Sequence, residues 1–180
     1  MRIISGRFKG RYIKTKEKMR PTEAKLRKVL FDILADKILG SRFLELFCGT
    51  GSVGIEALSR GVKEVLFVEN DWQCIKILKE NLAFIPHTTY SIFRSSVFKA
   101  IETLSKDKRR FDIVFLDPPY YRDLAKKTLN QLVKYDILTL RGIIIVQHHK
   151  KDKLAEKVGD LTVSRQEKYG DTILSFYIKK

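Results

Sequence analysis

From residue 43 onward, short apolar runs alternate with longer segments in which apolar residues recur every three or four positions. Each run has the length and the β-branched or aromatic content of a buried parallel strand. The segments between the runs have the spacing of amphipathic helices. The runs lie at 43–47, 65–68, 90–93, 111–116 and 143–146. This alternation predicts a parallel sheet covered by helices.

The chain has different patterns at its two ends. Apolar residues between 26 and 34 share one face of a predicted helix that begins near Thr22. Near the other end, predicted strands at 161–168 and 172–178 flank a tight turn at Gly170-Asp171 and must therefore be antiparallel. We expect an α/β fold over residues 21–180, with a Rossmann-like, mostly parallel sheet that ends in an antiparallel hairpin.

Charge is the most unusual feature of the composition. The 180 residues carry a formal net charge of +15, with a pI of about 9.8. A domain this basic is typical of proteins that bind a polyanion, above all nucleic acid. The chain has no apolar stretch of membrane-spanning length and begins without a signal-peptide pattern, so we expect a cytoplasmic monomer. Cys48 and Cys74 fall in apolar patterns and are expected to be buried, reduced thiols.

Residues 1–20 are the most basic segment and are predicted to form a small hairpin extension. Aromatic residues stand among its basic residues, and such groups can stack on bases while the cations meet phosphates. The alternative is a solvated edge strand protected by lysines. The candidate nucleic-acid contacts in and just after this segment are Arg2, Arg7, Lys9, Arg11, Arg20, Thr22 and Arg27.

A glycine-rich turn follows the first apolar run. The stretch from Gly49 to Gly54 matches the dinucleotide-binding fingerprint, and Glu69 follows at the spacing of a ribose-binding acid. This pattern fits a nicotinamide or flavin dehydrogenase, an S-adenosylmethionine-dependent methyltransferase, or a turn that only packs a helix closely. Glu45, within the run, disfavours a pyrophosphate and favours a cationic cofactor.

The stretch Asp117-Pro118-Pro119-Tyr120 follows the fourth apolar run. In a doubly wound sheet the first and fourth strands are neighbours, so this stretch and the glycine turn are expected to face one crevice. The Asp117 carboxylate and the Pro118 carbonyl can accept the two hydrogens of an exocyclic amine, and Tyr120 can stack on a base. Two acceptors would direct the amine lone pair toward a methyl donor, with Asp117 helping to remove a proton. This chemistry requires no metal. The structural alternative is a turn that ends the strand.

Several motifs together resemble those of the RsmD family of class I methyltransferases. They are Arg2-Ile3-Ile4-Ser5-Gly6, Gly10-Arg11, Arg20-Pro21-Thr22, Glu45, the stretch from Phe47 to Gly61, Glu69, Asp117-Pro118-Pro119-Tyr120 and Tyr169-Gly170-Asp171-Thr172. The resemblance spans nearly the whole chain. It implies methylation of the N2 amino group of a guanine in 16S ribosomal RNA, in naked RNA or in a partly assembled small subunit. It also implies a sheet of seven strands with one antiparallel strand.

The resemblance also implies where S-adenosylmethionine binds. The cofactor residues that it predicts are Glu45, Phe47, Gly49, Thr50, Gly51, Glu69, Asn70 and Ser96. Two departures stand out. Ser95-Ser96 replaces the family's usual acid that contacts the adenine amino group, so a serine hydroxyl or the backbone takes its place. Arg27-Lys28 replaces an Arg-Glu pair and makes this face more basic.

The leading hypothesis from the sequence is therefore an rRNA guanine-N2 methyltransferase. An enzyme acting on adenine N6 or cytosine N4 of DNA would use the same amine geometry. A non-catalytic RNA-binding assembly factor with the same fold is a third possibility, and a dehydrogenase is the fourth.

Overall fold

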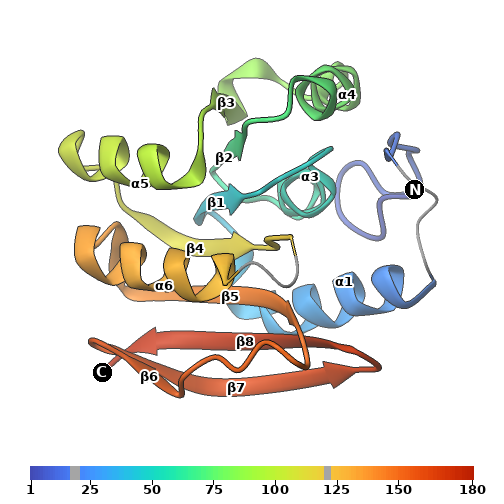
Figure 1. Cartoon of the computed structure of the whole chain (residues 1–180). Helices are drawn as coiled ribbons and strands as arrows, with labels where there is room; N and C mark the ends of the chain where they lie inside the picture. The colour runs from blue at the N-terminus through green and yellow to red at the C-terminus, as the bar shows by residue number, and fades with distance from the viewer. Residues whose placement is uncertain (17–20, 120–122) are drawn as a thin grey trace.

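The computed structural model describes residues 1–16, 21–119 and 123–180, with the backbone alone at 21–23 (Figure 1). Its helices are α1 (Pro21–Ile33), α2 (Ala35–Ile38), α3 (Ser52–Ser59), α4 (Trp72–Leu82), α5 (Val97–Lys106) and α6 (Leu124–Tyr135), with a 3₁₀ turn η1 (His87–Thr89). Its strands are β1 (Arg42–Leu46), β2 (Glu64–Glu69), β3 (Tyr90–Arg94), β4 (Phe111–Leu116), β5 (Leu138–His149), β6 (Lys157–Val158), β7 (Leu161–Tyr169) and β8 (Thr172–Lys179).

Within the described residues, eight strands form one sheet in the order β3-β2-β1-β4-β5-β8-β7-β6. The first five in this order are parallel, and β8 is antiparallel to β5 and to β7. The predicted α/β architecture and its late hairpin are confirmed. One detail differs, because β6 adds a short eighth strand that pairs antiparallel with β7. Its two residues lie in a polar stretch that carries no strand pattern.

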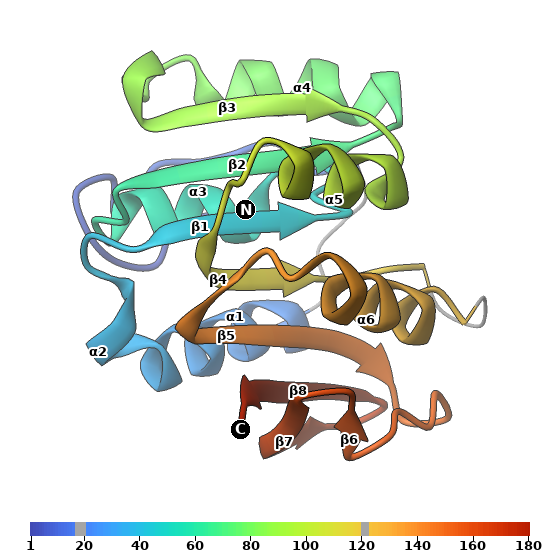
Figure 2. The same ribbon diagram turned by 90° about the vertical axis from the view of Figure 1, so that its left-hand side faces the viewer.

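The sheet is covered by helices on both faces (Figure 2). Apolar side chains of α1, α3 and α4 pack with alternate strand residues such as Phe43 and Ile113 on one face. Those of α5 and α6 pack with the intervening residues, such as Leu44 and Val114, on the other. Successive residues of a strand point to opposite faces of the sheet, so the positions of each central strand alternate between the two cores. Cys48 and Cys74 are both buried free thiols, as predicted.

The N-terminal segment, residues 1–16, packs against α3 and α4. Arg2 and Tyr12 form an antiparallel bridge, and the segment buries Ile3 and Ile13. The carboxylate of Glu56 in α3, which is 1% exposed, accepts the backbone N–H groups of residues 4 and 5 at 2.8 and 3.0 Å. These contacts satisfy a buried charge and fix the segment against α3.

Asn81 in α4 joins the N-terminal segment to the glycine turn. Its side-chain oxygen accepts the N–H of Lys14 at 2.7 Å. Its side-chain nitrogen donates to the carbonyls of Lys14 and Thr50 at 2.9 and 3.0 Å. Asn81 is 4% exposed, so this amide is a buried polar link with its hydrogen bonds formed inside the protein.

The turn between β1 and α3 brings the helix close to the sheet. A Cβ atom added to Gly54 would lie 2.4 Å from the Phe67 ring and 2.6 Å from Oε2 of Glu45. Instead, the N–H of Gly54 donates to Glu45 Oε2 at 2.8 Å. Burial raises the pKa of Glu45 to about 8, the N–H groups of Gly54 and Val53 oppose that rise, and the charges of Asp117 and Glu69 add to it.

In the part of the chain that the structure describes, no helix combines the length and the apolar character needed to span a bilayer.

The raised pKa of Glu45 predicts a dependence of stability on pH. The folded protein holds this proton up to about pH 8, whereas an ordinary Glu loses it near 4.5. The free energy of unfolding should therefore fall as pH rises between these values. The variant Glu45→Gln keeps an oxygen for the Gly54 N–H and has no proton to lose. Its stability relative to the wild type should rise by on the order of 3 kcal/mol from pH 5 to 8.

Urea unfolding at a series of pH values measures this difference. Glu102→Gln, which changes a carboxylate whose pKa is lowered by Lys106, is the control and should show no such rise. A difference between Glu45→Gln and wild type that stays flat across this range would contradict the assignment of Glu45 as a buried, proton-holding group.

Candidate active site

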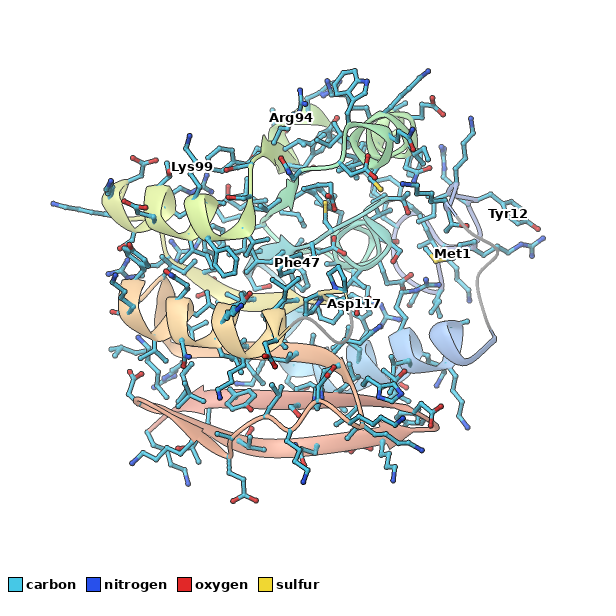
Figure 3. All side chains as sticks on the ribbon, in the orientation of Figure 1. Met1, Tyr12, Phe47, Arg94, Lys99 and Asp117 are labelled. Atoms are coloured by element: carbon cyan, nitrogen blue, oxygen red, sulfur yellow. The ribbon has the colours of Figure 1, made fainter. Side chains whose placement is uncertain are left out.

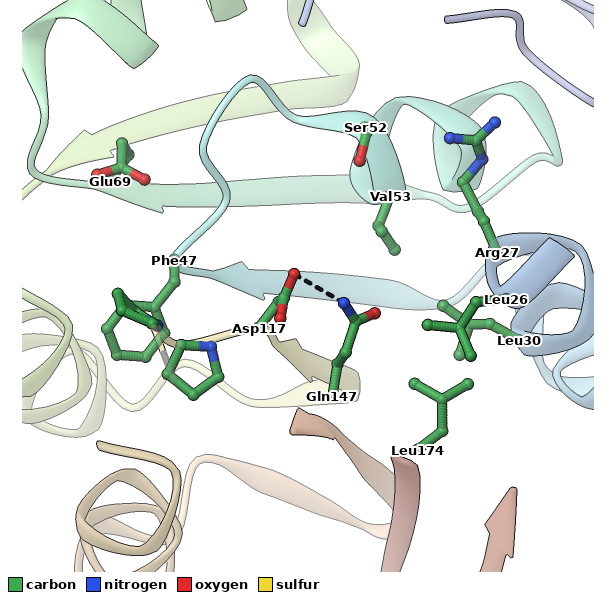
Figure 4. A pocket seen from close by; sticks show the side chains of 12 residues that line it. Leu26, Arg27, Leu30, Phe47, Ser52, Val53, Glu69, Asp117, Gln147 and Leu174 are labelled. Carbon is green, nitrogen blue, oxygen red and sulfur yellow. Dashed lines mark hydrogen bonds between the residues drawn. The ribbon is translucent and has the colours of Figure 1, made fainter. Parts of the chain in front are cut away.

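A cavity of about 480 Å³ opens at the carboxyl ends of β1, β4 and β5. Strand ends at a point where the strand order reverses are the usual ligand site of an open α/β sheet. The residues that line the cavity are Leu26, Arg27, Leu30, Phe47, Ser52, Val53, Glu69, Asp117, Pro118, Pro119, Gln147 and Leu174 (Figure 4). The glycine turn and the stretch that begins at Asp117 thus face one crevice, as the motifs predict.

Asp117 lies at the centre of this cavity, directly after β4. Oδ2 of its carboxylate accepts a hydrogen bond from Nε2 of Gln147 at 3.0 Å, drawn as the dashed line in Figure 4. Gln147 belongs to β5, which pairs with β4, and it is the first residue after the apolar run of that strand. The amide holds one carboxylate oxygen of Asp117 in a fixed direction.

Gln147 is a polar cavity residue that the sequence analysis missed. A signal for it exists in the sequence, because it is a polar residue at the carboxyl end of a strand that follows the strand of Asp117. Polar residues in that position of a parallel sheet face the ligand edge.

Glu69 ends β2 on the other side of Asp117. Its Oε2 accepts the N–H of Gly49 at 2.8 Å. Its Oε1 accepts the N–H groups of Asn70 and Asp71 at 2.7 and 2.9 Å. A carboxylate offers about four lone-pair sites, so three such bonds leave capacity for a ligand hydroxyl. The bonds also fix the carboxylate beside the glycine turn.

A second cavity of about 190 Å³ adjoins the first and shares Phe47 and Glu69 with it. Its other lining residues are Val68, Asn70, Ser95, Ser96, Val97 and Phe98. Ser96 caps α5, since its Oγ accepts the N–H of Lys99 at 3.4 Å. Apolar walls with a few polar groups at the rim are suited to a flat heteroaromatic ring, and the shared Glu69 is suited to a sugar next to it.

The structure thus brings together four of the predicted cofactor residues, namely Phe47, Glu69, Asn70 and Ser96, around these two cavities. The other four do not line either cavity and lie in the glycine turn or beneath it. Gly49 donates to Glu69, the Thr50 carbonyl accepts from Asn81, and Gly51 has a positive φ of 79° that favours glycine. Glu45 lies beneath the turn and is absent from the lining of both cavities.

The predicted nucleic-acid residues divide into two groups. Arg2, Arg7, Lys9 and Arg11 are exposed on the N-terminal segment. Arg27 is instead 6% exposed and lines the larger cavity. Arg20 and Tyr120 lie outside the described residues, and of Thr22 only the backbone, inside α1, is described.

Arg27 is held by two separate parts of the chain. Its Nη1 donates to Sδ of Met1 and its Nη2 to the carbonyl of Arg2 at 3.0 Å. Its Nε lies 3.9 Å from Oε2 of Glu56. A buried guanidinium with these contacts fixes α1 to the N-terminal segment and to α3 at the wall of the cavity. Arg27 was predicted to contact nucleic acid, which requires an exposed side chain, whereas the structure buries it.

The larger cavity has two ends. Figure 4 shows Phe47 and Glu69 on one side of Asp117, and Leu26, Leu30 and Leu174 on the other. Among the described residues, no group of three or more His, Cys, Asp or Glu side chains is arranged to hold a metal. The arrangement can hold an adenosine-like group at one end and present a second ligand to Asp117, between two apolar walls.

The chain was compared with known families and structures. The family described as conserved hypothetical protein 95 matches residues 1–178. YlbH of Bacillus subtilis (strain 168), whose name proposes an rRNA methyltransferase, is 37% identical over an alignment of 183 positions. This alignment covers 100% of each chain. Ribosomal RNA small subunit methyltransferase D of Buchnera aphidicola subsp. Acyrthosiphon pisum is 34% identical over 84% of this chain and 80% of its own.

A solved structure agrees with the sequence relatives. The yhhF protein of Escherichia coli, whose name also proposes a methyltransferase, superposes with a TM-score of 0.88 at 27% identity, over 100% of this chain and 98% of its own. The match to YlbH and the match to the solved structure each cover the whole of this chain. The chain therefore belongs to the family described as conserved hypothetical protein 95, and the RsmD resemblance of its motifs is confirmed.

Proposed function

We propose that this protein is an S-adenosylmethionine-dependent methyltransferase that modifies the exocyclic N2 amino group of a guanine in 16S ribosomal RNA. The observation that carries the proposal is the position of Asp117, whose carboxylate lines a cavity that shares Phe47 and Glu69 with a second cavity. The names of the relatives, an rRNA methyltransferase and a ribosomal RNA small subunit methyltransferase D, agree with it. The exposed cations of the N-terminal segment suit an RNA substrate.

The two cavities fit the parts of this cofactor. The smaller cavity, with Phe47, Val97 and Phe98 as apolar walls and Ser96 at its rim, would hold the adenine. Glu69 would accept hydrogen bonds from the ribose hydroxyls, and the larger cavity would take the methionine portion toward Asp117. The cofactor supplies an activated methyl group on a positively charged sulfur. Glu45 would act through the turn, since its carboxyl group orients the N–H of Gly54 beneath the cavity.

In this proposal, the residues around Asp117 bind and orient the target amine. The lone pair of an exocyclic amine is delocalised into the base, so it must be directed toward the methyl group to react. The Asp117 carboxylate and the Pro118 carbonyl would each accept one amine N–H, which fixes the direction of the lone pair. The same carboxylate would stabilise the positive charge that develops on the amine nitrogen and accept its proton. Tyr120, outside the described residues, is proposed to stack on the base.

Gln147 has a positioning role in this proposal. Its Nε2 donates to Oδ2 of Asp117 and would hold the carboxylate in the direction in which it meets the amine. An amide also provides this hydrogen bond without adding a further negative charge to a cavity that Asp117 and Glu69 already line.

Replacement of Asp117 tests the catalytic proposal. Asp117→Ala should bind S-adenosylmethionine with an affinity within about two-fold of the wild type, because Asp117 holds the amine rather than the cofactor. Its rate of methyl transfer should fall by about 10²- to 10³-fold, as when one charge-stabilising group is lost. Calorimetry measures the binding and single-turnover methylation measures the rate. Asp107→Ala, which changes an acid at the far end of α5, is the control. Turnover unchanged in Asp117→Ala would refute this mechanism.

Replacement of Gln147 tests the positioning role. Gln147→Leu keeps the size of the side chain and removes the donor to Asp117, so kcat should fall by about 10-fold while the KM for the cofactor stays unchanged. Gln166→Leu is matched to it, because Gln166 on β7 also donates its amide to another side chain, Ser175, at 2.9 Å. Gln166→Leu should keep the kcat of the wild type. If Gln147→Leu keeps it as well, the proposed positioning role of Gln147 is wrong.

The substrate is tested by presenting several at once. The wild type is incubated with tritiated S-adenosylmethionine and, in parallel, 16S rRNA, small ribosomal subunits and duplex DNA. We expect methyl transfer to one of the ribosomal substrates, with N2-methylguanine as the product in nuclease digests. Methylated adenine or cytosine in the DNA would instead support the DNA-modifying alternative.

A further inference from the structure

Trp72 is an exposed aromatic residue to which the site described above gives no role. It is the only tryptophan of the chain and the first residue of α4, and it is 55% exposed. Tryptophan is a costly residue to leave in water, and one that is exposed beside a binding site is often part of it. Trp72 follows Asn70, which lines the smaller cavity, by two positions.

Two cations lie against the ring of Trp72. The guanidinium carbon of Arg94, the last residue of β3, is 5.4 Å from the ring centroid. Nζ of Lys79, two turns along α4, is 5.8 Å from it. Both distances fall within the range of a cation–π interaction. Arg94 precedes Ser96 by two positions, so Trp72 and Arg94 each lie two positions along the chain from a residue that lines the smaller cavity. Lys76 and Lys99 are exposed nearby on α4 and α5.

The acids of this surface are paired with the N-terminal segment. Lys16 bonds to Asp71 at 2.7 Å, and Lys14 bonds to Glu80 at 2.8 Å. The two lysines therefore offset the negative charges on either side of Trp72 and Lys79. They also join this surface to the basic N-terminal segment. In Figure 3, Arg94 and Tyr12 point outward at the edge of the molecule, and Figure 1 shows α4 between their two elements.

We propose that Trp72, together with Arg94 and Lys79, forms a stacking platform for an unpaired base of RNA that lies outside the catalytic cavity. The inference rests on the proposed RNA substrate and extends it to a second contact region. An indole or a guanidinium plane stacks on any base, and the neighbouring lysines can meet the phosphates on either side of it. Charge complementarity favours RNA over a protein partner, because an apolar partner would have to bury these cations without a counter-charge.

The fluorescence of the only tryptophan reports on the platform directly. The wild type, saturated with S-adenosylhomocysteine so that the cofactor causes no further change, is titrated with a short single-stranded RNA of mixed sequence. A second titration uses the same RNA annealed to its complement. Stacking of a base on Trp72 should quench the emission strongly with the single strand and weakly with the duplex, whose bases are already stacked. RNA binding without any change in emission would overturn the proposal.

Variants measure the contribution of the ring to RNA affinity. Trp72→Ala should weaken binding of the labelled single strand about 5- to 30-fold, as expected when one base–aromatic stack is lost. Trp72→Phe, which keeps a smaller ring, should restore part of the affinity. Leu140→Ala removes another exposed apolar side chain, 88% exposed near the start of β5, and should bind as the wild type does. Wild-type affinity in Trp72→Ala would refute the platform.

Three further outcomes distinguish this proposal from the proposed function and from a protein partner. At saturating RNA, Trp72→Ala should transfer methyl groups at the wild-type rate, so its defect should appear in the KM for RNA alone. If the wild type quenches with RNA yet methylates none, the platform stands and the proposed function fails. If Trp72→Ala loses affinity for small ribosomal subunits but not for naked RNA, the partner is a protein and the platform proposal fails.

Discussion

The close approach of α3 to the sheet is the constraint on which the rest of the site depends. Gly54 leaves no room for a side chain between the helix and the Phe67 ring, and its N–H binds the buried carboxyl group of Glu45. This contact sets the direction in which α3 begins and therefore the path of the glycine turn above it. Glu69, bonded to Gly49 of that turn, takes its position from the same arrangement. The buried Glu45 in the central strand β1 thus helps to position the glycine turn and Glu69 at the carboxyl ends of the strands.

Much of the fold could be predicted because its central strands are buried on both faces. Strands of this kind appear as continuous apolar runs, and right-handed crossovers leave few ways to order them. The position of Asp117 beside the glycine turn followed from that order alone. The short strand β6 could not be predicted, since its two residues form a strand only because β7 lies next to them. Its pairing depends on tertiary contact and has no periodicity of its own.

The candidate site was less predictable where a side chain's role depends on distant segments. Arg27 looked like a surface cation because basic residues surround it in the sequence. Its burial results from Met1, Arg2 and Glu56, which only the folded chain brings to it. Charge counting cannot distinguish a guanidinium that meets solvent from one that binds the protein's own carbonyl and carboxylate groups. Gln147 shows the reverse case, in which a neutral residue outside every motif lines the cavity and bonds to the Asp117 carboxylate.

The amide of Asn81 has a consequence for comparing and recombining proteins of this family. One side chain bonds both to Lys14 of the N-terminal segment and to the Thr50 carbonyl of the glycine turn. The N-terminal segment and the glycine turn are therefore joined through a single buried amide. A chimera that exchanges the first residues between two relatives must carry the residue at position 81 with them, or it will leave unsatisfied polar groups under the glycine turn.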